Sequence, residues 1–398
     1  MIFRNKKILI GITGGIAAYK TCYLIRSIKK QGGSVRIILT GSGSQFVGST
    51  TLEAISGEKV ATDLFEPAQS DTILHIDLAR WPDLFVIAPA TANTIAKTVH
   101  GIADDILSTV ILACSQKIIF APAMNEDMWN NKVTQENLKK LNKLGHKIIP
   151  PGTGELACET EGIGRMAEPA EIEKFIIKEL GLKLDLTGKK ILVTAGGTEE
   201  PIDPVRVIGN RSSGKMGIAL AEAAASRGAE VTLIAGTHSV HLPKFVTVIN
   251  VRTAAEMQKA VEKEFPDCDV LIMAAAVADF KPAKMSKTKI KKGSLDKMSI
   301  DLEPTQDILK EVTKNKQGRI VVGFSLETDN EIGNARKKLK DKNLDLIVLN
   351  NPLKKGSEFG SDSNRITILQ PRKKPGEYPL LSKADAADNI LDAVSRLF

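Results

Sequence analysis

The sequence lacks several features that mark membrane, metal-binding or nucleic-acid-binding proteins. Its longest apolar run, Val270 to Ala278, is far shorter than the roughly 18 residues of a membrane span. The four cysteines lie far apart and form no CxxC pair, which argues against a zinc site or a disulfide framework. Aromatic residues make up only 4% of the chain and do not alternate with basic residues, so the net charge of +8 does not indicate nucleic-acid binding. The excess charge instead fits phosphate-bearing small molecules.

The N-terminal apolar stretch is also too short for a signal peptide and runs into a glycine turn rather than a cleavage site. We therefore expect a cytoplasmic protein with reduced cysteines, without a membrane or nucleic-acid partner.

The chain contains two similar openings. Residues 6–10 and 189–193 both read Lys-Lys followed by three aliphatic residues, and each run leads into a pair of glycines. Each opening predicts a buried parallel strand followed by a tight turn and a helix. Further aliphatic strands alternate with helical patterns near residues 35–40, 84–88, 117–120 and 146–149 in the first half, and near 230–234, 246–250, 269–275, 319–324, 345–349 and 365–369 in the second.

This alternation predicts two doubly wound, Rossmann-like α/β domains whose parallel sheets are covered on both faces. The segment 181–189 is polar and contains two glycines, so we place the boundary there and expect domains at 1–184 and 185–398. In such sheets ligands bind beyond the carboxyl ends of the strands, and the segments that follow the strands are the candidate sites.

In the first half, the glycine-rich segment 11–15 follows the first strand, and the second strand ends at Thr40. Glycines allow close approach of a ligand, and a helix N-terminus favours phosphate. The spacing is not GxGxxG and no acidic residue follows the second strand, which favours a mononucleotide over NAD. A plain tight turn is the alternative interpretation.

Three further segments follow predicted strands or loops: Pro-Ala-Thr-Ala-Asn-Thr at 89–94, Pro-Ala-Met-Asn-Glu-Asp-Met-Trp at 122–129, and Gly-Glu-Leu-Ala-Cys at 154–158. His75 lies upstream of these segments. Taken singly, His75 and the residues of each segment have ordinary explanations. His75 could be structural, Cys158 could be a small packing residue, and Asn125 could cap the following helix.

Taken together and in this order, the segments resemble the flavin-dependent cysteine decarboxylases. The resemblance is strongest to the decarboxylase half of the bifunctional phosphopantothenoylcysteine decarboxylase/phosphopantothenate–cysteine ligases of coenzyme A synthesis. It implies a flavodoxin-like flavoprotein domain that binds FMN through Gly15, Ile16, Ala17, Thr40, Ala90, Thr91, Asn93, Ala123 and Met124.

The same resemblance implies the catalytic roles. His75 would be a base or would orient the substrate carboxylate, Asn125 would donate a hydrogen bond to that carboxylate, and Cys158 would act as the acid. A cysteine carboxylate has no electron sink, so the thiol must be oxidised before CO₂ leaves, and a flavin supplies that redox step. Glu159 departs from the glycine that is usual after the cysteine in this family.

In the second half, Gly209 to Lys215 matches GxxxxGK, but Met216 follows where a P-loop needs Ser or Thr. We therefore reject a P-loop. The strand near 269–275 ends in small residues that allow close approach of a ligand, and a lysine-rich segment follows Phe280. That segment is either a solvated loop or a lid over phosphates. Lys338 and Lys342 lie four apart on one helical face and are either exposed or hold phosphates.

The segments 194–217, 274–280, 289–292 and 338–350 resemble the ligase domain of the same bifunctional family. The resemblance implies that CTP activates a carboxylate, that Asn210 holds the acyl group, that Lys289 stabilises phosphoryl transfer, and that Mg²⁺ accompanies CTP near Asp279. The implied nucleotide site comprises Ala274, Ala275, Ala276, Asp279, Lys289, Asp307, Ile308, Phe324, Lys338 and Lys342. Val207 and Ser325-Leu326 depart from the family pattern.

The expected function is thus two consecutive steps of coenzyme A biosynthesis on 4′-phosphopantothenate, cysteine and CTP. The resemblance further implies a homo-oligomer, a dodecamer in which decarboxylase trimers are linked by ligase dimers. A peptidyl-cysteine decarboxylase and a non-catalytic flavin-binding regulatory protein are the alternatives. An NAD-dependent dehydrogenase is the generic alternative, but the chain lacks its fingerprint.

Overall fold

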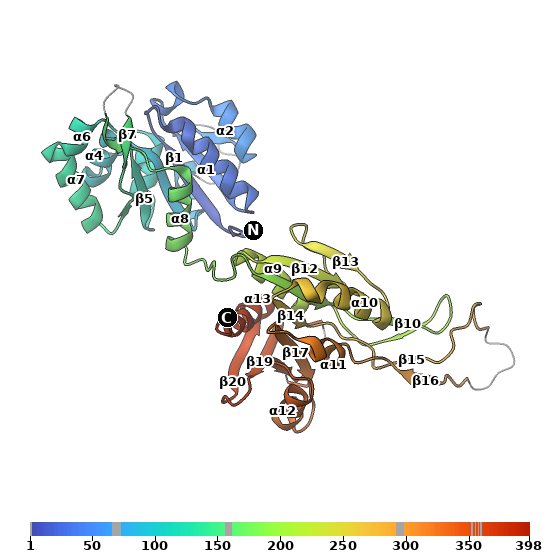
Figure 1. Cartoon of the computed structure of the whole chain (residues 1–398). Coiled ribbons are helices and arrows are strands. Elements are labelled where there is room, and N and C mark those ends of the chain that lie inside the picture. Colours follow the sequence, from blue (N-terminus) through green and yellow to red (C-terminus); the bar gives the residue numbers. More distant parts are fainter. Residues whose placement is uncertain are drawn as a thin grey trace. The chain divides into compact units, whose positions relative to one another are not determined.

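The computed structural model describes residues 2–65, 73–155, 161–291, 298–351, 353, 354, 356, 358 and 360–398. The chain forms two compact units, Met1–Lys183 and Leu184–Phe398, and each has its own central sheet (Figure 1). Across the described ranges, we find no helix with both the length and the apolar character needed to cross a bilayer.

Unit 1 is built on a parallel sheet of order β3-β2-β1-β4-β5-β6. The strands are β1 (Lys7–Ile12), β2 (Ser34–Leu39), β3 (Val60–Ala61), β4 (Leu84–Ala90), β5 (Ile118–Pro122) and β6 (Lys147–Ile148). An antiparallel pair, β7 (Gly152–Glu155) and β8 (Glu161–Arg165), lies outside this sheet. The helices are α1 (Ala18–Lys30), α2 (Ser49–Ser56), α3 (Leu74–Arg80), α4 (Ala92–His100), α5 (Ile106–Ala113), α6 (Glu126–Asn130), α7 (Lys132–Lys143) and α8 (Pro169–Glu179), with a 3₁₀ turn η1 (Gly43–Gln45).

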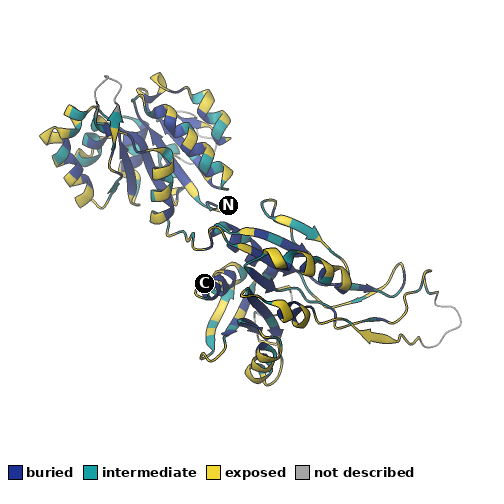
Figure 2. Ribbon diagram, in the orientation of Figure 1, coloured by how far each residue is buried: buried dark blue, intermediate teal, exposed yellow. Residues whose placement is uncertain are grey.

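The central strands of unit 1 are buried on both faces, as Figure 2 shows by the dark interior of the sheet. Leu9 of β1 packs into the cluster formed with α3, α4, α5 and α7, and its neighbours Ile8 and Ile10 point to the other face. Their near-continuous apolar sequence follows from this two-sided burial.

Unit 2 has an eight-stranded sheet of order β13-β12-β9-β14-β17-β18-β19-β20. These strands are β9 (Lys190–Ala195), β12 (Glu230–Ala235), β13 (Thr247–Asn250), β14 (Val270–Met273), β17 (Ile320–Leu326), β18 (Leu346–Asn350), β19 (Ser363–Leu369) and β20 (Gly376–Ser382). The helices are α9 (Lys215–Ser226), α10 (Ala254–Glu264), α11 (Ile308–Val312), α12 (Glu331–Asp341) and α13 (Lys383–Ser395), with 3₁₀ turns η2 (Phe265–Asp267) and η3 (Thr313–Asn315).

The two faces of this sheet have separate helical layers. Helices α9 and α13 pack against one face, through residues such as Leu220 and Ile390. Helices α10, α11 and α12 cover the other face, through residues such as Val261 and Leu339. The prediction of doubly wound α/β units is confirmed.

The prediction of a wholly parallel second sheet is wrong at one edge. β19 pairs antiparallel with β18, and β20 pairs antiparallel with β19. The strand near 365–369 was expected, but its direction was not, because an aliphatic run does not encode orientation. β20 was not expected, because its Pro379 and largely exposed residues give little strand signal.

Two short antiparallel ribbons form an arm on unit 2 (Figure 1). They are β10 (Glu199–Pro201) with β11 (Val207–Gly209), and β15 (Phe280–Pro282) with β16 (Leu302–Pro304). Asp203 joins them: its buried carboxylate accepts hydrogen bonds from Val205 N and Arg206 N, both at 2.8 Å, and from Ile290 N at 3.0 Å. These donors, with Ile290 N–H the strongest, lower the pKa of Asp203 to about 2.

Helix α9 approaches strand β9 so closely that only glycine fits at position 217. A Cβ there would lie 2.6 Å from Ala195 Cβ and 2.7 Å from Thr194 O. Gly217→Ala should push α9 off the sheet and destabilise unit 2 by about 1–3 kcal/mol, as overpacking does. We expect faster hydrogen exchange, measured by mass spectrometry, in the amides of α9 and β9.

Gly376→Ala is the matched control, because a Cβ at that position meets its nearest atoms at an ordinary 3.7 Å. Exchange in α9 and β9 that stays at the native rate in Gly217→Ala would show that the helix does not need this close approach.

Candidate functional site

In unit 1, the loops that follow β1 and β4 are joined through one threonine. Thr13 Oγ1 donates to Pro89 O at 2.7 Å and accepts from Thr91 N at 3.2 Å. Gly14 packs against the loop after β2, since a Cβ on it would lie 2.5 Å from Ser42 Cβ. At Gly15 the nearest atom to an added Cβ is 3.9 Å away, so the backbone there is open to a ligand.

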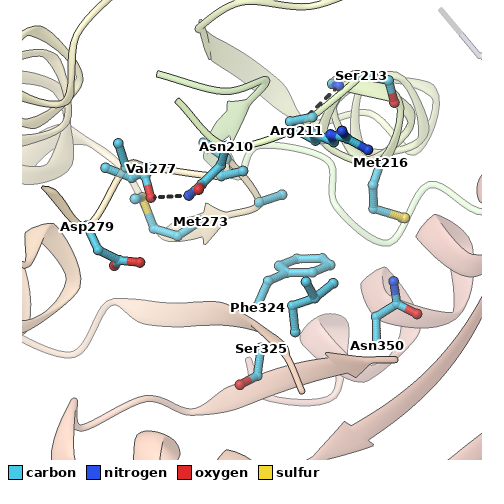
Figure 3. Close-up of a pocket in the computed structure, with 18 of the residues that line it drawn as sticks. Asn210, Arg211, Ser213, Met216, Met273, Val277, Asp279, Phe324, Ser325 and Asn350 are labelled. Atoms are coloured by element: carbon cyan, nitrogen blue, oxygen red, sulfur yellow. Dashed lines mark hydrogen bonds between the residues drawn. The ribbon is translucent and has the colours of Figure 1, made fainter. Parts of the chain in front are cut away.

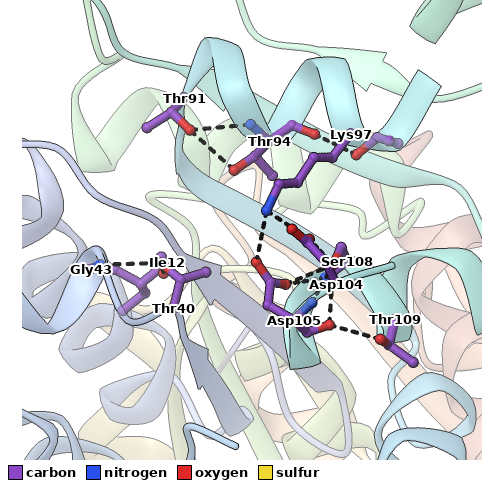
Figure 4. A network of polar contacts seen from close by, with 11 residues as sticks. Ile12, Thr40, Gly43, Thr91, Thr94, Lys97, Asp104, Asp105, Ser108 and Thr109 are labelled. Carbon is purple, nitrogen blue, oxygen red and sulfur yellow. Dashed lines mark hydrogen bonds and ion pairs between the residues drawn. The ribbon is translucent and has the colours of Figure 1, made fainter. Parts of the chain in front are cut away.

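The threonines predicted to bind a cofactor are already hydrogen bonded within the protein (Figure 4). Thr40 is buried; its Oγ1 accepts from Gly43 N at 3.1 Å and contacts Ile12 O at 3.3 Å. Thr91 caps α4, with Oγ1 accepting from Thr94 N at 3.2 Å. Ser42, which is exposed, carries an accessible hydroxyl in the loop after β2.

Helix α4 is also held in place through Lys97, in its second half. Lys97 Nζ pairs with Asp104 Oδ1 at 2.7 Å and with Asp105 Oδ2 at 3.4 Å, which raises the pKa of Lys97, chiefly through Asp104 (Figure 4). Asp105 in turn caps α5 through Ser108 N at 2.7 Å. The helix that carries Asn93 therefore has a fixed position.

The loop after β5 completes this edge of the sheet. Ala123 N donates to Ala90 O at 3.1 Å, and Met124 N donates to Gly164 O at 3.1 Å. Asn125 caps α6, because its Oδ1 accepts from Met128 N at 2.9 Å. Asn125 therefore caps the helix, as the ordinary explanation of its position expected. The cap uses only Oδ1, so the Nδ2 group of Asn125 is left as a donor.

His75 is the second residue of α3 and is partly exposed. Cys158 lies outside the described residues, as does Glu159. Residues 15–17, 91 and 123–125 lie on the loops after β1, β4 and β5 at one edge of the sheet. Ala90 ends β4 and Asn93 lies in the first turn of α4, at the same edge. Such an edge fits a planar cofactor that carries a phosphate.

Unit 2 has a cavity of about 810 Å³ at the carboxyl edge of its sheet (Figure 3). Every residue of the predicted nucleotide site except Lys289 lines it: Ala274, Ala275, Ala276, Asp279, Asp307, Ile308, Phe324, Lys338 and Lys342. Asn210 also lines it, and its Nδ2 donates to Val277 O at 2.9 Å. One hydrogen of that amide group and its oxygen remain for a ligand.

At one end of the cavity, two lysines lie among three carboxylates. Lys342 Nζ pairs with Asp307 Oδ2 at 2.7 Å, and Lys338 Nζ donates to Phe324 O at 2.7 Å. Burial and the neighbouring Lys342 lower the pKa of Lys338, while Glu327, Asp307 and Asp279 oppose this. Ser325, which departs from the family pattern, donates from Oγ to Glu327 Oε1 at 2.6 Å and so fixes the Glu327 carboxylate.

Lys289 does not line the cavity. It lies exposed on the arm, beside Ile290, which is bound to Asp203 and Arg206. Two lysines that line the cavity, Lys215 and Lys383, were not predicted. Lys215 belongs to the rejected GxxxxGK motif, and that motif could have predicted a phosphate-binding lysine here. Lys383 lies near the chain end, far from any motif, so no sequence signal indicated it.

No cluster of three or more His, Cys, Asp or Glu that could bind a metal occurs in the part of the chain that the structure describes.

Comparison with known proteins matches both units to families. The model of the DNA/pantothenate metabolism flavoprotein C-terminal domain matches residues 186–397, and the Flavoprotein model matches residues 3–181. The chain is 42% identical over 399 residues to the Coenzyme A biosynthesis bifunctional protein CoaBC of Bacillus subtilis (strain 168), covering 100% of this chain and 98% of that protein.

Two further relatives have similar coverage. The CoaBC protein of Vibrio vulnificus (strain YJ016) is 42% identical over 395 residues, covering 99% of this chain and 98% of that protein. A Cysteine/Cysteine sulfinic acid decarboxylase from an unidentified prokaryote is 47% identical over 353 residues, covering 87% of this chain and 98% of that protein.

The charge of Lys338 should depend on Glu327. A carboxylate near an ammonium favours its protonated form, so Glu327→Gln should lower the pKa of Lys338 further. In a titration toward high pH, Lys338 of the variant would then lose its proton at a lower pH than Lys338 of the native protein. An NMR titration of the lysine side chain measures this pKa.

Glu331→Gln is the control, because Glu331 is paired with Lys354 and does not line the cavity. A pKa of Lys338 that is unchanged or raised in Glu327→Gln would remove Glu327 from the charge balance of the cavity.

Proposed function

The chain belongs to the family of bifunctional coenzyme A biosynthesis proteins, a decarboxylase and phosphopantothenate–cysteine ligase, and we propose how its units divide these two steps. Unit 1, which corresponds to the domain expected at 1–184, is the FMN-dependent decarboxylase. Unit 2, which corresponds to the domain expected at 185–398, is the CTP-dependent ligase. The observation that carries the proposal is the cavity of unit 2, which brings Asn210, Asp279 and Lys338 together from separate parts of the chain.

Amide formation needs an activated carboxylate, because a free carboxylate is a poor electrophile. In the proposed reaction, a carboxylate oxygen of 4′-phosphopantothenate attacks the α-phosphorus of CTP, and pyrophosphate leaves. The cysteine amine then attacks the acyl carbon of the acyl-cytidylate and displaces CMP. The free N–H of Asn210 Nδ2 is suited to hold the acyl oxygen through both attacks.

The nucleoside occupies the end of the cavity at Phe324 and Lys338. The small residues 274–276 let it approach the sheet edge, and the half-buried Phe324 ring offers an apolar face to the base. Lys338 is fixed by Phe324 O, so its remaining N–H groups point away from that carbonyl and are available to the nucleotide.

Magnesium and Lys289 complete the proposed ligase site. Mg²⁺ would arrive with CTP and bind near Asp279, where it neutralises phosphate charge. Lys289 lies on the arm, so the arm must approach the cavity, by closure or across a ligase dimer, before its ammonium can contact phosphate. We propose the homo-oligomer implied by the family resemblance, with decarboxylase trimers and ligase dimers, in the cytoplasm.

In unit 1, residues of the loops after β1, β4 and β5 would hold FMN. Gly15, Ile16 and Ala17 offer backbone before α1, Ala90 lies at the end of β4, Thr91 and Asn93 lie at the start of α4, and Ala123 and Met124 follow β5. When bound, FMN supplies the electron sink that decarboxylation requires. Thr40 contributes by shaping its loop, since its hydroxyl is already engaged.

The substrate-facing residues of unit 1 are proposed to be His75, Asn125 and Cys158. With its oxygen held by Met128 N, the Asn125 side chain presents Nδ2 as a donor for the substrate carboxylate. His75 is partly exposed and therefore accessible as a base or as a second carboxylate partner. Cys158 is proposed as the acid of the final reduction.

The relative named Cysteine/Cysteine sulfinic acid decarboxylase supports a second candidate, decarboxylation of free cysteine by unit 1. The candidates differ in their dependence on CTP, because only the bifunctional reaction needs an activated acyl group before CO₂ can be released.

The purified protein should be yellow from bound oxidised flavin. Given 4′-phosphopantothenate, cysteine, CTP and Mg²⁺, it should form CMP and CO₂ in equal amounts, since each ligated cysteine is then decarboxylated. The two amounts are measured by chromatography for CMP and by a coupled assay for CO₂. Release of CO₂ from cysteine alone, at the same rate and without CTP, would favour the second candidate.

Asn125→Asp should abolish decarboxylation while it preserves folding. Aspartate caps a helix as well as asparagine does, but it cannot donate a hydrogen bond and it repels the substrate carboxylate. We expect a loss of about 100-fold or more in kcat/KM for 4′-phosphopantothenoylcysteine, as for a removed charge-stabilising donor.

Asn131 provides a matched control, since it caps α7 in the same way, with Oδ1 accepting from Val133 N at 2.9 Å. Asn131→Asp should leave decarboxylation at the native rate. Equal losses in both variants would instead indicate that the helix caps, rather than the amide donor, carry the effect.

A further inference from the structure

The two ends of the cavity in unit 2 differ in their charge. At the end described above, Lys338 and Lys342 are balanced by Asp279, Asp307 and Glu327. Three carboxylates beside two ammonium groups leave no excess positive charge. Without a bound metal ion, this end therefore suits an uncharged nucleoside better than a polyphosphate.

The other end has two lysines at the first positions of two helices. Lys215 begins α9 and Lys383 begins α13, and these helices pack together on the same face of the sheet. Both lysines line the cavity, and so does Arg211. Within the described part of the chain, helix α9 has no side-chain cap, so the N–H groups of its first turn add to the positive potential there.

The acidic groups at this end lie mostly in solvent. Lys215 Nζ pairs with Asp362 Oδ1 at 2.6 Å and donates to Gly360 O at 2.7 Å, but the Asp362 side chain is 93% exposed. Glu358 also lines the cavity and is exposed. A carboxylate with so much exposure is well hydrated and holds its lysine weakly, so an incoming anion can replace it.

The Lys383 ammonium has no carboxylate or carbonyl partner among the described residues. Burial and the neighbouring Lys215 lower the pKa of Lys383, and Asp362 opposes this. A partly buried ammonium without a partner is costly, and a bound anion would remove that cost.

Asn364 gives an independent indication of a ligand at this end. Its side chain lines the cavity, it is only 5% exposed, and its Oδ1 has no hydrogen-bond partner among the described residues. Asn350, which also lines the cavity, has the same unpartnered oxygen. Buried carboxamides normally have partners, so these two amides indicate a polar ligand. Because an amide oxygen only accepts hydrogen bonds, an anion would be bound by the NH₂ group of the flipped amide.

We propose that Lys383, together with Lys215, binds the pyrophosphate that leaves the α-phosphorus of the nucleotide. This inference rests on the proposed ligase function. As the bond between the α-phosphorus and the bridging oxygen breaks, its electron pair goes to that oxygen, and the charge develops on pyrophosphate. The two ammonium groups stabilise this charge without a transfer of protons.

The test is inhibition of the ligase by two products measured separately, inorganic pyrophosphate and CMP. In Lys383→Gln, inhibition by pyrophosphate should weaken by about tenfold or more, as expected for a lost charged hydrogen bond, while inhibition by CMP stays within about twofold. Lys383→Arg, which keeps the charge, should restore most of the pyrophosphate inhibition.

Lys374→Gln is the control, because Lys374 is exposed and does not line the cavity. It should match the native protein in both inhibition constants. Decarboxylation by unit 1 and the melting temperature report whether Lys383→Gln is folded. If that variant is unfolded, Lys383→Met, which keeps the aliphatic stem, provides the same comparison.

Three results would overturn the inference. Unchanged pyrophosphate inhibition in Lys383→Gln would remove Lys383 from the site. A raised KM for 4′-phosphopantothenate alone would mean that this end holds the phosphate of the acyl substrate, and a raised KM for cysteine alone would mean that it holds an amino-acid carboxylate. Absence of CMP formation in the native protein would contradict the proposed function instead.

Discussion

The cavity of unit 2 depends on the turn formed by Gly196 and Gly197 after β9, which joins the loops on either side. Gly197 N donates to Thr237 O at 2.9 Å, and Ala276 N donates to Gly196 O at 2.8 Å. A Cβ on Gly236 would collide with the carbonyl of Gly197. The loops after β12 and β14 thus meet across this turn, and residues 274–279 are fixed at the cavity wall.

Unit 1 reaches a similar arrangement with a side chain rather than backbone. Thr13 contacts both Pro89 O and Thr91 N, so one hydroxyl joins the loops after β1 and β4. Both units therefore use the first strand of a doubly wound sheet to align its neighbours. They differ in what the aligned loops present: backbone and neutral side chains in unit 1, and charged side chains in unit 2.

Much of this could be predicted from sequence, because aliphatic runs identify buried strands and the segments after parallel strands meet at one edge. Asn210, Asp279 and Lys338 were predicted from the resemblance to the ligase family, and their segments do meet at the cavity. The sequence could not show that the Thr40 hydroxyl is engaged by Gly43 N, because residue type does not give hydrogen-bond direction. The arm ribbons were missed since they are short, polar and contain proline. Lys383 was missed because its neighbourhood depends on how α13 packs beside α9.

The difference between backbone donors and ammonium groups fits the different fates of the two ligands. A cofactor that stays bound through many cycles is best held by fixed backbone, which needs no rearrangement on binding. In the proposed ligase reaction, pyrophosphate must leave in every cycle, and strong fixed contacts would slow its release. A lysine that can return to an exposed carboxylate, as Lys215 can to Asp362, has an alternative partner once the anion departs. An exposed ion pair of this kind contributes little to stability, so its exchange costs little free energy.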